Sequence, residues 1–164
     1  MRRFENYDIP SNLEGLVISP GGVASTSIME HVQTFIKIND AGDRDGLKHR
    51  PKPSSRLDRD LPVLLVVGDS HQIVQSLERR GYLPHQAIRL GCWAYFIAPR
   101  RLRVERLCRA INRQKRTWSR RGESTLILEF DELWDRSSEI ADLFGITNHG
   151  FLDDFPQRKQ RFTG

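Results

Sequence analysis

A glycine-rich segment carries the residues of this chain that are best suited to bind an anion. Ser19-Pro20-Gly21-Gly22 follows the apolar residues 16–18, and Ser25-Thr26-Ser27 then begins a stretch with helical periodicity. Glycines permit positive φ angles and a close approach of the backbone, so the amides of such a turn and the positive end of the next helix can hold a phosphate or sulfate group. The alternative is an ordinary turn between a strand and a helix, with Ser25 as the helix cap.

Lys48-His49-Arg50-Pro51 is the second candidate for chemistry. The side-chain pKa of a histidine is about 6.5, so His49 can accept a proton from a hydroxyl group at neutral pH. Lys48 can stabilise negative charge on a group in transfer. The alternative is a solvated basic loop. Glu30, in the stretch after the glycine-rich segment, is a reserve candidate for the base.

The glycine-rich segment lacks the lysine of a nucleoside-triphosphatase loop. In the pattern G-x-x-x-x-G-K-[ST], a lysine precedes the hydroxyl residue and reaches the phosphates. Here Ser25 precedes Thr26, and residues 20–30 contain no lysine. The sequence therefore disfavours an enzyme that transfers a phosphoryl group from a magnesium–nucleotide complex.

The elements that would position these residues alternate between strands and helices. Apolar runs at 16–18, 62–67 and 125–130 predict buried strands, and 92–97 is a further strand candidate. Helical periodicity follows each of the three main runs. This order predicts an α/β fold with three layers around a short parallel sheet, in which ligands bind beyond the carboxyl ends of the strands. Residues 39–60 have no clear period and predict a long loop.

Segments in the same order resemble the sulfotransferases that use 3′-phosphoadenosine 5′-phosphosulfate (PAPS). The first strand of that family ends in a Pro-[Lys/Arg]-Ser-Gly-[Ser/Thr]-Thr loop, and residues 20–26 are similar to it. A second strand of the family precedes Arg-Asp-Pro, which resembles Gly68-Asp69-Ser70, and a serine eight residues after the arginine matches Ser76. A tryptophan-bearing helix, a strand and a further helix of the family are similar to Trp118, 126–133 and 143–146.

The resemblance implies a P-loop-like domain that transfers a sulfuryl group from PAPS to a hydroxyl or amine acceptor, such as a glycan. It implies that Ser76 contacts the 3′-phosphate of PAPS and that His49, in a His-x-Pro segment, takes the proton of the acceptor. Lys48 would stabilise the sulfuryl group, and no metal is required. The 5′-phosphosulfate would be held by the residues of the loop: Gly21, Gly22, Val23, Ala24, Ser25, Thr26 and Ser27.

Several positions depart from the family pattern. Gly21 stands where the loop has its basic residue, Gly68 replaces the arginine of the 3′-phosphate site, and Ala24 stands where glycine is usual. The loop is also one residue longer, and the chain is shorter than most members of the family. A domain that binds a nucleotide or another anion without turnover is therefore an alternative to the enzyme.

The positive charge of the chain comes from one segment. Ten arginines and lysines lie between Arg100 and Arg121, against the single acid Glu105, whereas the whole chain has a net charge of +5. The apolar residues at i, i+3, i+4 and i+7 from Val104 predict a helix there. Its arginines could contact nucleic acid, an anionic glycan or the nucleotide, or form a solvated surface.

The composition predicts one domain rather than several. At 164 residues and 38% hydrophobic content, the chain can bury a single core. We expect an irregular lead-in over 1–14, the functional domain over 15–147 and a polar, peripheral tail over 148–164. No apolar run is long enough for a membrane span, no secretory signal is visible, and two cysteines cannot alone form a zinc site, so a cytoplasmic protein is expected.

Overall fold

The computed structural model describes residues 10–23 and 25–158, and its centre is a parallel β-sheet of three strands. The strands lie in the order β1 (Leu16–Ile18), β2 (Val63–Val67) and β3 (Thr125–Glu129). Leu16 pairs with Val63, and Val63 pairs with Thr125. The prediction of an α/β fold with a short parallel sheet is confirmed, and β1 and β2 are neighbours. The segments that follow these two strands therefore begin at the same edge of the sheet.

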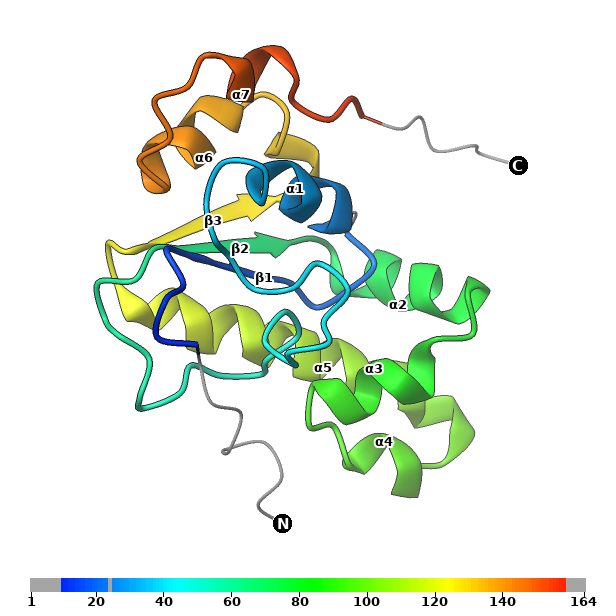
Figure 1. Cartoon of the computed structure of the whole chain (residues 1–164). Coiled ribbons are helices and arrows are strands. Elements are labelled where there is room, and N and C mark those ends of the chain that lie inside the picture. The colour runs from blue at the N-terminus through cyan, green and yellow to red at the C-terminus, as the bar shows by residue number, and fades with distance from the viewer. Residues whose placement is uncertain (1–9, 24, 159–164) are drawn as a thin grey trace.

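Helices lie on both faces of the sheet (Figure 1). One face is covered by α1 (Ser25–Val32), α6 (Ser137–Leu143) and α7 (Gly150–Asp153), and the other by the long helix α5 (Arg100–Trp118). The remaining α-helices continue from the carboxyl end of β2, and they are α2 (Ser70–Arg79), α3 (Leu83–Arg89) and α4 (Ala94–Ile97). Two short 3₁₀ segments, 119–121 and 130–132, flank β3. Within the described residues, no helix is both long and apolar enough to cross a membrane.

The side chains of the strands alternate between two hydrophobic clusters. Val17, Leu64 and Leu128 belong to the larger cluster, which contains the buried residues of most of the helices. Leu16 and Leu65 belong to the smaller cluster, which includes Trp118 of α5. Both faces of β1 and β2 are thus buried, which explains why these strands are continuously apolar instead of alternating with polar residues.

Residues 39–60 form a long connection without helix or strand, as predicted. Asn39 holds its first residues against the free edge of β1, because its side chain accepts a hydrogen bond from the Val17 amide (2.7 Å) and donates one to the Val17 carbonyl (3.0 Å). Leu47 and Leu57 are buried in the smaller hydrophobic cluster. The loop is therefore packed onto the domain, and the buried residues Lys48 and His49 lie within it.

Helix α2 begins directly after Asp69, which is its N-cap residue. The Asp69 side chain accepts hydrogen bonds from the amides of His71 (3.0 Å) and Gln72 (2.9 Å). These bonds satisfy two backbone donors that the first turn of a helix leaves without partners. Gly81, with a φ of 71°, follows the last turn and reverses the chain toward α3.

The strand predicted over 92–97 is wrong, because this segment contains the helix α4. Cys92, Tyr95 and Ala98 are buried at a spacing of three residues, which is a helical repeat. A strand would need every second side chain on the buried face. The aromatic and β-branched residues of this run have high strand propensity, but the contacts of α4 with α3 and α5 determine its conformation.

The segment after residue 148 is not peripheral throughout, contrary to the expectation from its polar composition. Phe151 of α7 is fully buried, and its carbonyl lies 2.8 Å from His31 Nε2 on α1. The rings of Phe35 and Phe155 pack edge-on against Phe151. Three aromatic side chains around a histidine thus attach this segment to α1.

Candidate functional site

The glycine-rich segment forms a compact loop between β1 and α1. Gly21 and Gly22 have positive φ angles of 84° and 76°, which residues with a Cβ atom rarely adopt. The hydroxyls of Ser19 and Ser25, both buried, lie 2.9 Å apart and join the two ends of the loop. The Gly21 amide donates a weak hydrogen bond of 3.4 Å to the Ser19 hydroxyl. The loop is therefore closed by its own side chains before α1 begins.

Side chains from two other helices lie over the glycines. A Cβ atom at Gly21 would be 3.1 Å from the side-chain amide carbon of Gln86 on α3. At Gly22 it would be 3.3 Å from a guanidinium nitrogen of Arg80, directly after α2. A residue with a Cβ atom would thus be unfavourable at either position, because the φ angle is positive and because polar side chains lie close. The sequence contains no pattern that brings Gln86 or Arg80 to this loop.

Lys48 reaches the first turn of α1 from the long connection. Its Nζ donates hydrogen bonds to Thr26 Oγ1 (2.7 Å) and to the Ala41 carbonyl (2.8 Å). The side chain is buried, and this burial lowers the pKa of Lys48, whereas the negative charges of Asp43 and Glu30 oppose the shift. The structure therefore brings Lys48 to the loop, although no lysine occurs within the loop sequence. The reserve base Glu30 is exposed on α1.

His49 lies at the end of β1, on the side of the loop. Its Nδ1 lies 2.8 Å from the carbonyl of Ser19. Because a carbonyl only accepts hydrogen bonds, Nδ1 carries the proton and Nε2 is the basic nitrogen. Burial lowers the pKa of His49 to about 4, and the nearby positive charges of Arg89 and Lys48 also lower it. His49 is therefore a neutral imidazole at pH 7, and its Nε2 is a weaker base than that of an ordinary histidine.

An ion pair with a buried carboxylate and a half-buried guanidinium lies next to these two residues. Asp43 accepts a hydrogen bond from the Lys48 amide (2.9 Å), and its other oxygen is 3.0 Å from Nη1 of Arg89. Burial raises the pKa of Asp43, and the charge of Arg89 opposes that shift. The φ of Asp43 is 59°, which an aspartate adopts more readily than most residues. Asp43 thus fixes the backbone of the connection directly before His49, a role that the sequence did not indicate.

Side chains of α5 contact both the end of β1 and the Lys48–Arg50 segment of the long connection. Nε2 of Gln114 donates to the carbonyl of Arg50 (2.9 Å) and lies 3.5 Å from the carbonyl of Ser19. The indole N–H of Trp118 also donates to the carbonyl of Arg50 (2.9 Å). Both side chains are buried. These bonds hold the Lys48–Arg50 segment next to the end of β1, and Gln114 was not a candidate from the sequence.

Gln86 provides a polar group that the protein itself does not satisfy. Its side chain is 4% exposed, and its Nε2 has no hydrogen-bond partner among the residues that the structure describes. A buried donor without a partner is unfavourable by about 1–3 kcal/mol. Because the Gln86 amide faces Gly21, an oxygen of an anion held by the loop would satisfy it. The glycine-rich loop thus has a buried amide beside it whose donor is left without a partner among the described residues.

The other predicted site residues are placed less favourably. Val23 is buried and packs toward Gly68, so its side chain belongs to the core, and Ser27 is half-buried in the first turn of α1. Ser76 is half-buried on α2, where its carbonyl accepts a hydrogen bond from Nε of Arg80 (3.0 Å). Ala24 lies outside the described residues. Arg80 links Ser76 to the loop, through its position beside Gly22.

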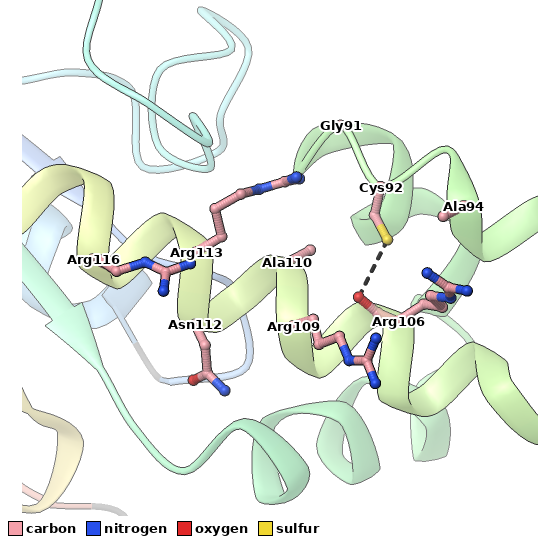
Figure 2. Close-up of a pocket in the computed structure, with 9 residues that line it drawn as sticks. All are labelled: Gly91, Cys92, Ala94, Arg106, Arg109, Ala110, Asn112, Arg113 and Arg116. Atoms are coloured by element: carbon pink, nitrogen blue, oxygen red, sulfur yellow. Dashed lines mark hydrogen bonds between the residues drawn. The ribbon is translucent and has the colours of Figure 1, made fainter.

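Two cavities with basic linings lie outside the loop. The first, of about 520 Å³, lies between α5 and the segment after α3 (Figure 2), and we call it the α5 cavity. Its arginines are Arg106, Arg109, Arg113 and Arg116. The second, of about 630 Å³, is lined mainly by residues 50–56 and by Thr117, Arg120 and Arg121. In the described part of the chain, no three His, Cys, Asp or Glu side chains are grouped as metal ligands.

The arrangement combines a glycine-rich loop before a helix with a lysine and a neutral histidine. Lys48 bonds to Thr26 in the first turn of α1, the Gln86 amide lies beside Gly21, and His49 bonds to Ser19 at the end of β1. A turn of this kind at a helix N-terminus is of the type that binds anions in other proteins. Comparison of the chain with protein-family models, with curated proteins and with solved structures found no match in any of the three.

Proposed function

We propose that the protein transfers a sulfuryl group from PAPS to a hydroxyl or amine acceptor, on a P-loop-like fold. The observation that carries the proposal is the placement of two consecutive residues on one loop. Lys48 bonds to Thr26 at the start of α1, and His49 bonds to Ser19 at the end of β1. The positively charged Lys48 ammonium group and the neutral His49 imidazole are thus held at opposite ends of the same turn. An ordinary turn between a strand and a helix requires neither of them.

In this proposal the loop binds the 5′-phosphosulfate of PAPS, which is a substrate consumed in each turnover. Amides of the Gly21–Ser25 turn and the positive end of α1 face the anion. The Lys48 ammonium compensates for Gly21, which stands where a basic residue is expected. The unpartnered Nε2 of Gln86 supplies one more donor. Arg80 is the candidate for the 3′-phosphate, because its guanidinium lies beside Gly22 and its Nε is bonded to the carbonyl of Ser76.

The chemical step is a displacement at sulfur. Nε2 of His49 takes the proton from the acceptor O–H or N–H, and the acceptor atom forms a bond to sulfur. The bond between sulfur and the bridging oxygen of the 5′-phosphate breaks, and that oxygen leaves with the electron pair. The products are the sulfated acceptor and 3′,5′-adenosine bisphosphate, with the proton on His49. Lys48 and the loop amides stabilise the charge on the oxygens of the group in transfer.

A second candidate is a domain that binds the nucleotide without turnover. The observation that favours it is the burial of His49, which lies among Ser19, Lys48 and Arg89 and leaves little surface for an acceptor. In this case the loop, Lys48 and Gln86 would hold the nucleotide as described, and His49 would serve only to fix the end of β1.

Two measurements test the function and separate the candidates. Calorimetric titration with 3′,5′-adenosine bisphosphate, with 5′-AMP as the control, is expected to give a Kd on the order of micromolar for the bisphosphate alone. Transfer of ³⁵S from labelled PAPS to a panel of alcohols, amines and glycans then tests turnover, with His49→Asn as the matched variant. Absence of binding at millimolar bisphosphate would exclude both candidates. Tight binding without transfer to any acceptor in the panel would favour the binding domain.

A further inference from the structure

Helix α4 exposes three large apolar side chains next to one another. The exposed fractions are 51% for Trp93, 40% for Phe96 and 87% for Ile97, and the first two rings lie 6.2 Å apart. We call these three residues the α4 tip. Figure 1 shows α4 at the end of the molecule away from the sheet, beyond α3 and the start of α5. Large apolar groups gathered at such a position commonly mark a binding surface.

The inner side of α4 is firmly packed, so the exposure of the tip does not result from a loose segment. Tyr95 is buried, and the guanidinium of Arg103 lies 5.7 Å from the centre of its ring. The thiol of Cys92, directly before α4, donates a hydrogen bond of 3.4 Å to the carbonyl of Arg106 (Figure 2). Pro99 then separates α4 from α5. The fold thus fixes a short helix with its apolar side outward.

Positive charge surrounds the α4 tip. Arg100 and Arg101 are exposed and lie three and four residues after Ile97 in the sequence. The α5 cavity adjoins the tip, because Cys92 and Ala94, on either side of Trp93 in the sequence, line it together with Arg106 and Arg109 (Figure 2). The nearby acid, Glu105, is already paired with Arg109. Within the described residues, no acidic side chain forms an ion pair with the other arginines of this surface: Arg100, Arg101, Arg106, Arg113 and Arg116.

We infer that the α4 tip and these arginines bind the surface of a bilayer that contains anionic lipids. Trp93, Phe96 and Ile97 enter the boundary between headgroups and acyl chains, and Arg100, Arg101 and the arginines of the α5 cavity contact lipid phosphates. Tryptophan and other large apolar residues next to arginines are typical of proteins that bind this interface. The anionic surface attracts each arginine, and the apolar groups are removed from water.

Two other occupants agree less well with these observations. Nucleic acid would pair with the arginines, but its phosphates offer nothing to Ile97, which is the most exposed apolar side chain of this surface. A second copy of the chain would place two strongly basic surfaces against each other, because residues 100–121 contain ten cations and one acid. A lipid surface complements both the charge and the apolar tip, and this inference is independent of the proposed sulfuryl transfer.

Sedimentation with vesicles tests the inference with the full chain. We expect binding to vesicles of phosphatidylcholine with 30% phosphatidylserine at 0.1 M salt, and little binding to phosphatidylcholine alone. Ile97→Asp should weaken binding about tenfold or more, because the bilayer would no longer bury the apolar Ile97 side chain on binding. Arg100→Gln with Arg101→Gln should weaken it about fivefold for each charge removed. The matched control is Leu152→Asp, which changes an apolar residue of 45% exposure on α7, across the sheet from α4, and should leave binding unchanged.

The fluorescence of Trp93 gives a second readout. Trp118 is buried, and Trp134 is half-buried with its indole N–H bonded to the carbonyl of Pro156. Brominated lipids in the anionic vesicles should quench the wild-type emission, and Trp93→Phe should remove most of that quenching. The inference is overturned if anionic vesicles do not bind the protein, or if Ile97→Asp binds them as well as the wild type does. It is also overturned if sedimentation velocity shows a dimer that Ile97→Asp dissociates, or if only duplex DNA binds.

Discussion

Lys48 and Thr26 are 22 positions apart in the chain, and a hydrogen bond of 2.7 Å joins Nζ of the lysine to Oγ1 of the threonine. The loop itself contains no lysine, so the long connection supplies the cation that the loop sequence lacks. Because Lys48 is also bonded to the carbonyl of Ala41, its ammonium group has a defined position next to the first turn of α1. This contact makes Lys48 the first residue to test in the proposed site.

Replacement of Lys48 by methionine should greatly reduce the affinity for 3′,5′-adenosine bisphosphate. Methionine keeps most of the buried volume but removes the charge and the donors to Thr26 and Ala41, and a hydrogen bond to a charged group contributes about 1.5–3 kcal/mol. We expect the Kd in calorimetry to rise about tenfold to a hundredfold. The control is Lys37→Met, since Lys37 is exposed beyond the end of α1. Equal affinities of the two variants would contradict the role assigned to Lys48.

Gly21→Ala and Gly81→Ala form a matched pair that separates backbone strain from crowding. Both glycines have positive φ angles, 84° and 71°, so each alanine should lower the free energy of unfolding by about 1–2 kcal/mol. A Cβ atom at Gly21 would meet the Gln86 amide, whereas nothing lies within 4 Å of one at Gly81. Urea denaturation should therefore give a larger loss for Gly21→Ala than for Gly81→Ala, and nucleotide binding should fall for Gly21→Ala alone. Unchanged binding by Gly21→Ala would show that the loop does not hold the ligand.

The buried His49 should make the protein less stable in acid. Its pKa is about 4 in the folded chain, against an ordinary value of 6.5 when the chain is unfolded, so below pH 6.5 the unfolded chain binds a proton that the folded chain does not. The free energy of unfolding should fall by up to about 3 kcal/mol between pH 7 and pH 4. Asp43, whose pKa is raised, acts in the opposite direction, so the comparison must be made with a variant at residue 49.

His49→Asn is that variant, because the asparagine amide can still donate to the carbonyl of Ser19. Urea denaturation at pH 4, 5, 6 and 7 should show a shallower loss of stability in acid for the variant than for the wild type. Parallel curves would mean that the pKa of His49 is the same in the folded and the unfolded chain. If transfer activity is found, the same pKa predicts that His49 is neutral throughout the range from pH 6 to 8. The transfer rate should then be constant over this range in the wild type, and His49→Asn should show no transfer.

The Asp43–Arg89 pair should contribute to stability mainly by avoiding an unpaired buried charge. Arg89→Met leaves the Asp43 carboxylate without its cation and should lower the free energy of unfolding by about 1–3 kcal/mol, since Arg89 is about one-third exposed and partly screened. Asp43→Asn in the same chain should restore part of this loss, because asparagine tolerates the positive φ. A double-mutant cycle by chemical denaturation measures the coupling. A coupling energy of zero would show that the two charges do not interact.

The sequence by itself determined the sheet and the loop at its edge. Runs of apolar residues without polar alternation are possible only for strands buried on both faces, and β1 and β2 are such strands. Gly21 and Gly22 affect the backbone at their own positions, and Asp69 bonds to amides two and three residues later. The turn and the helix start could therefore be predicted from the local sequence. The long connection over 39–60 could also be recognised locally, because its apolar residues follow neither the helical nor the strand repeat.

Tertiary structure alone decided what surrounds the loop. Gln86 lies beside Gly21, Arg89 pairs with Asp43, and Gln114 bonds to the carbonyl of Arg50. The sequences of α3 and α5 carry no sign of these contacts, which exist only because the helices pack next to the loop and the long connection. The conformation of α4 and the burial of Phe151 likewise depend on partners distant in the sequence. Local propensity is weak compared with the free energy of burying a side chain against such partners, and which partners meet is determined only when the chain has folded.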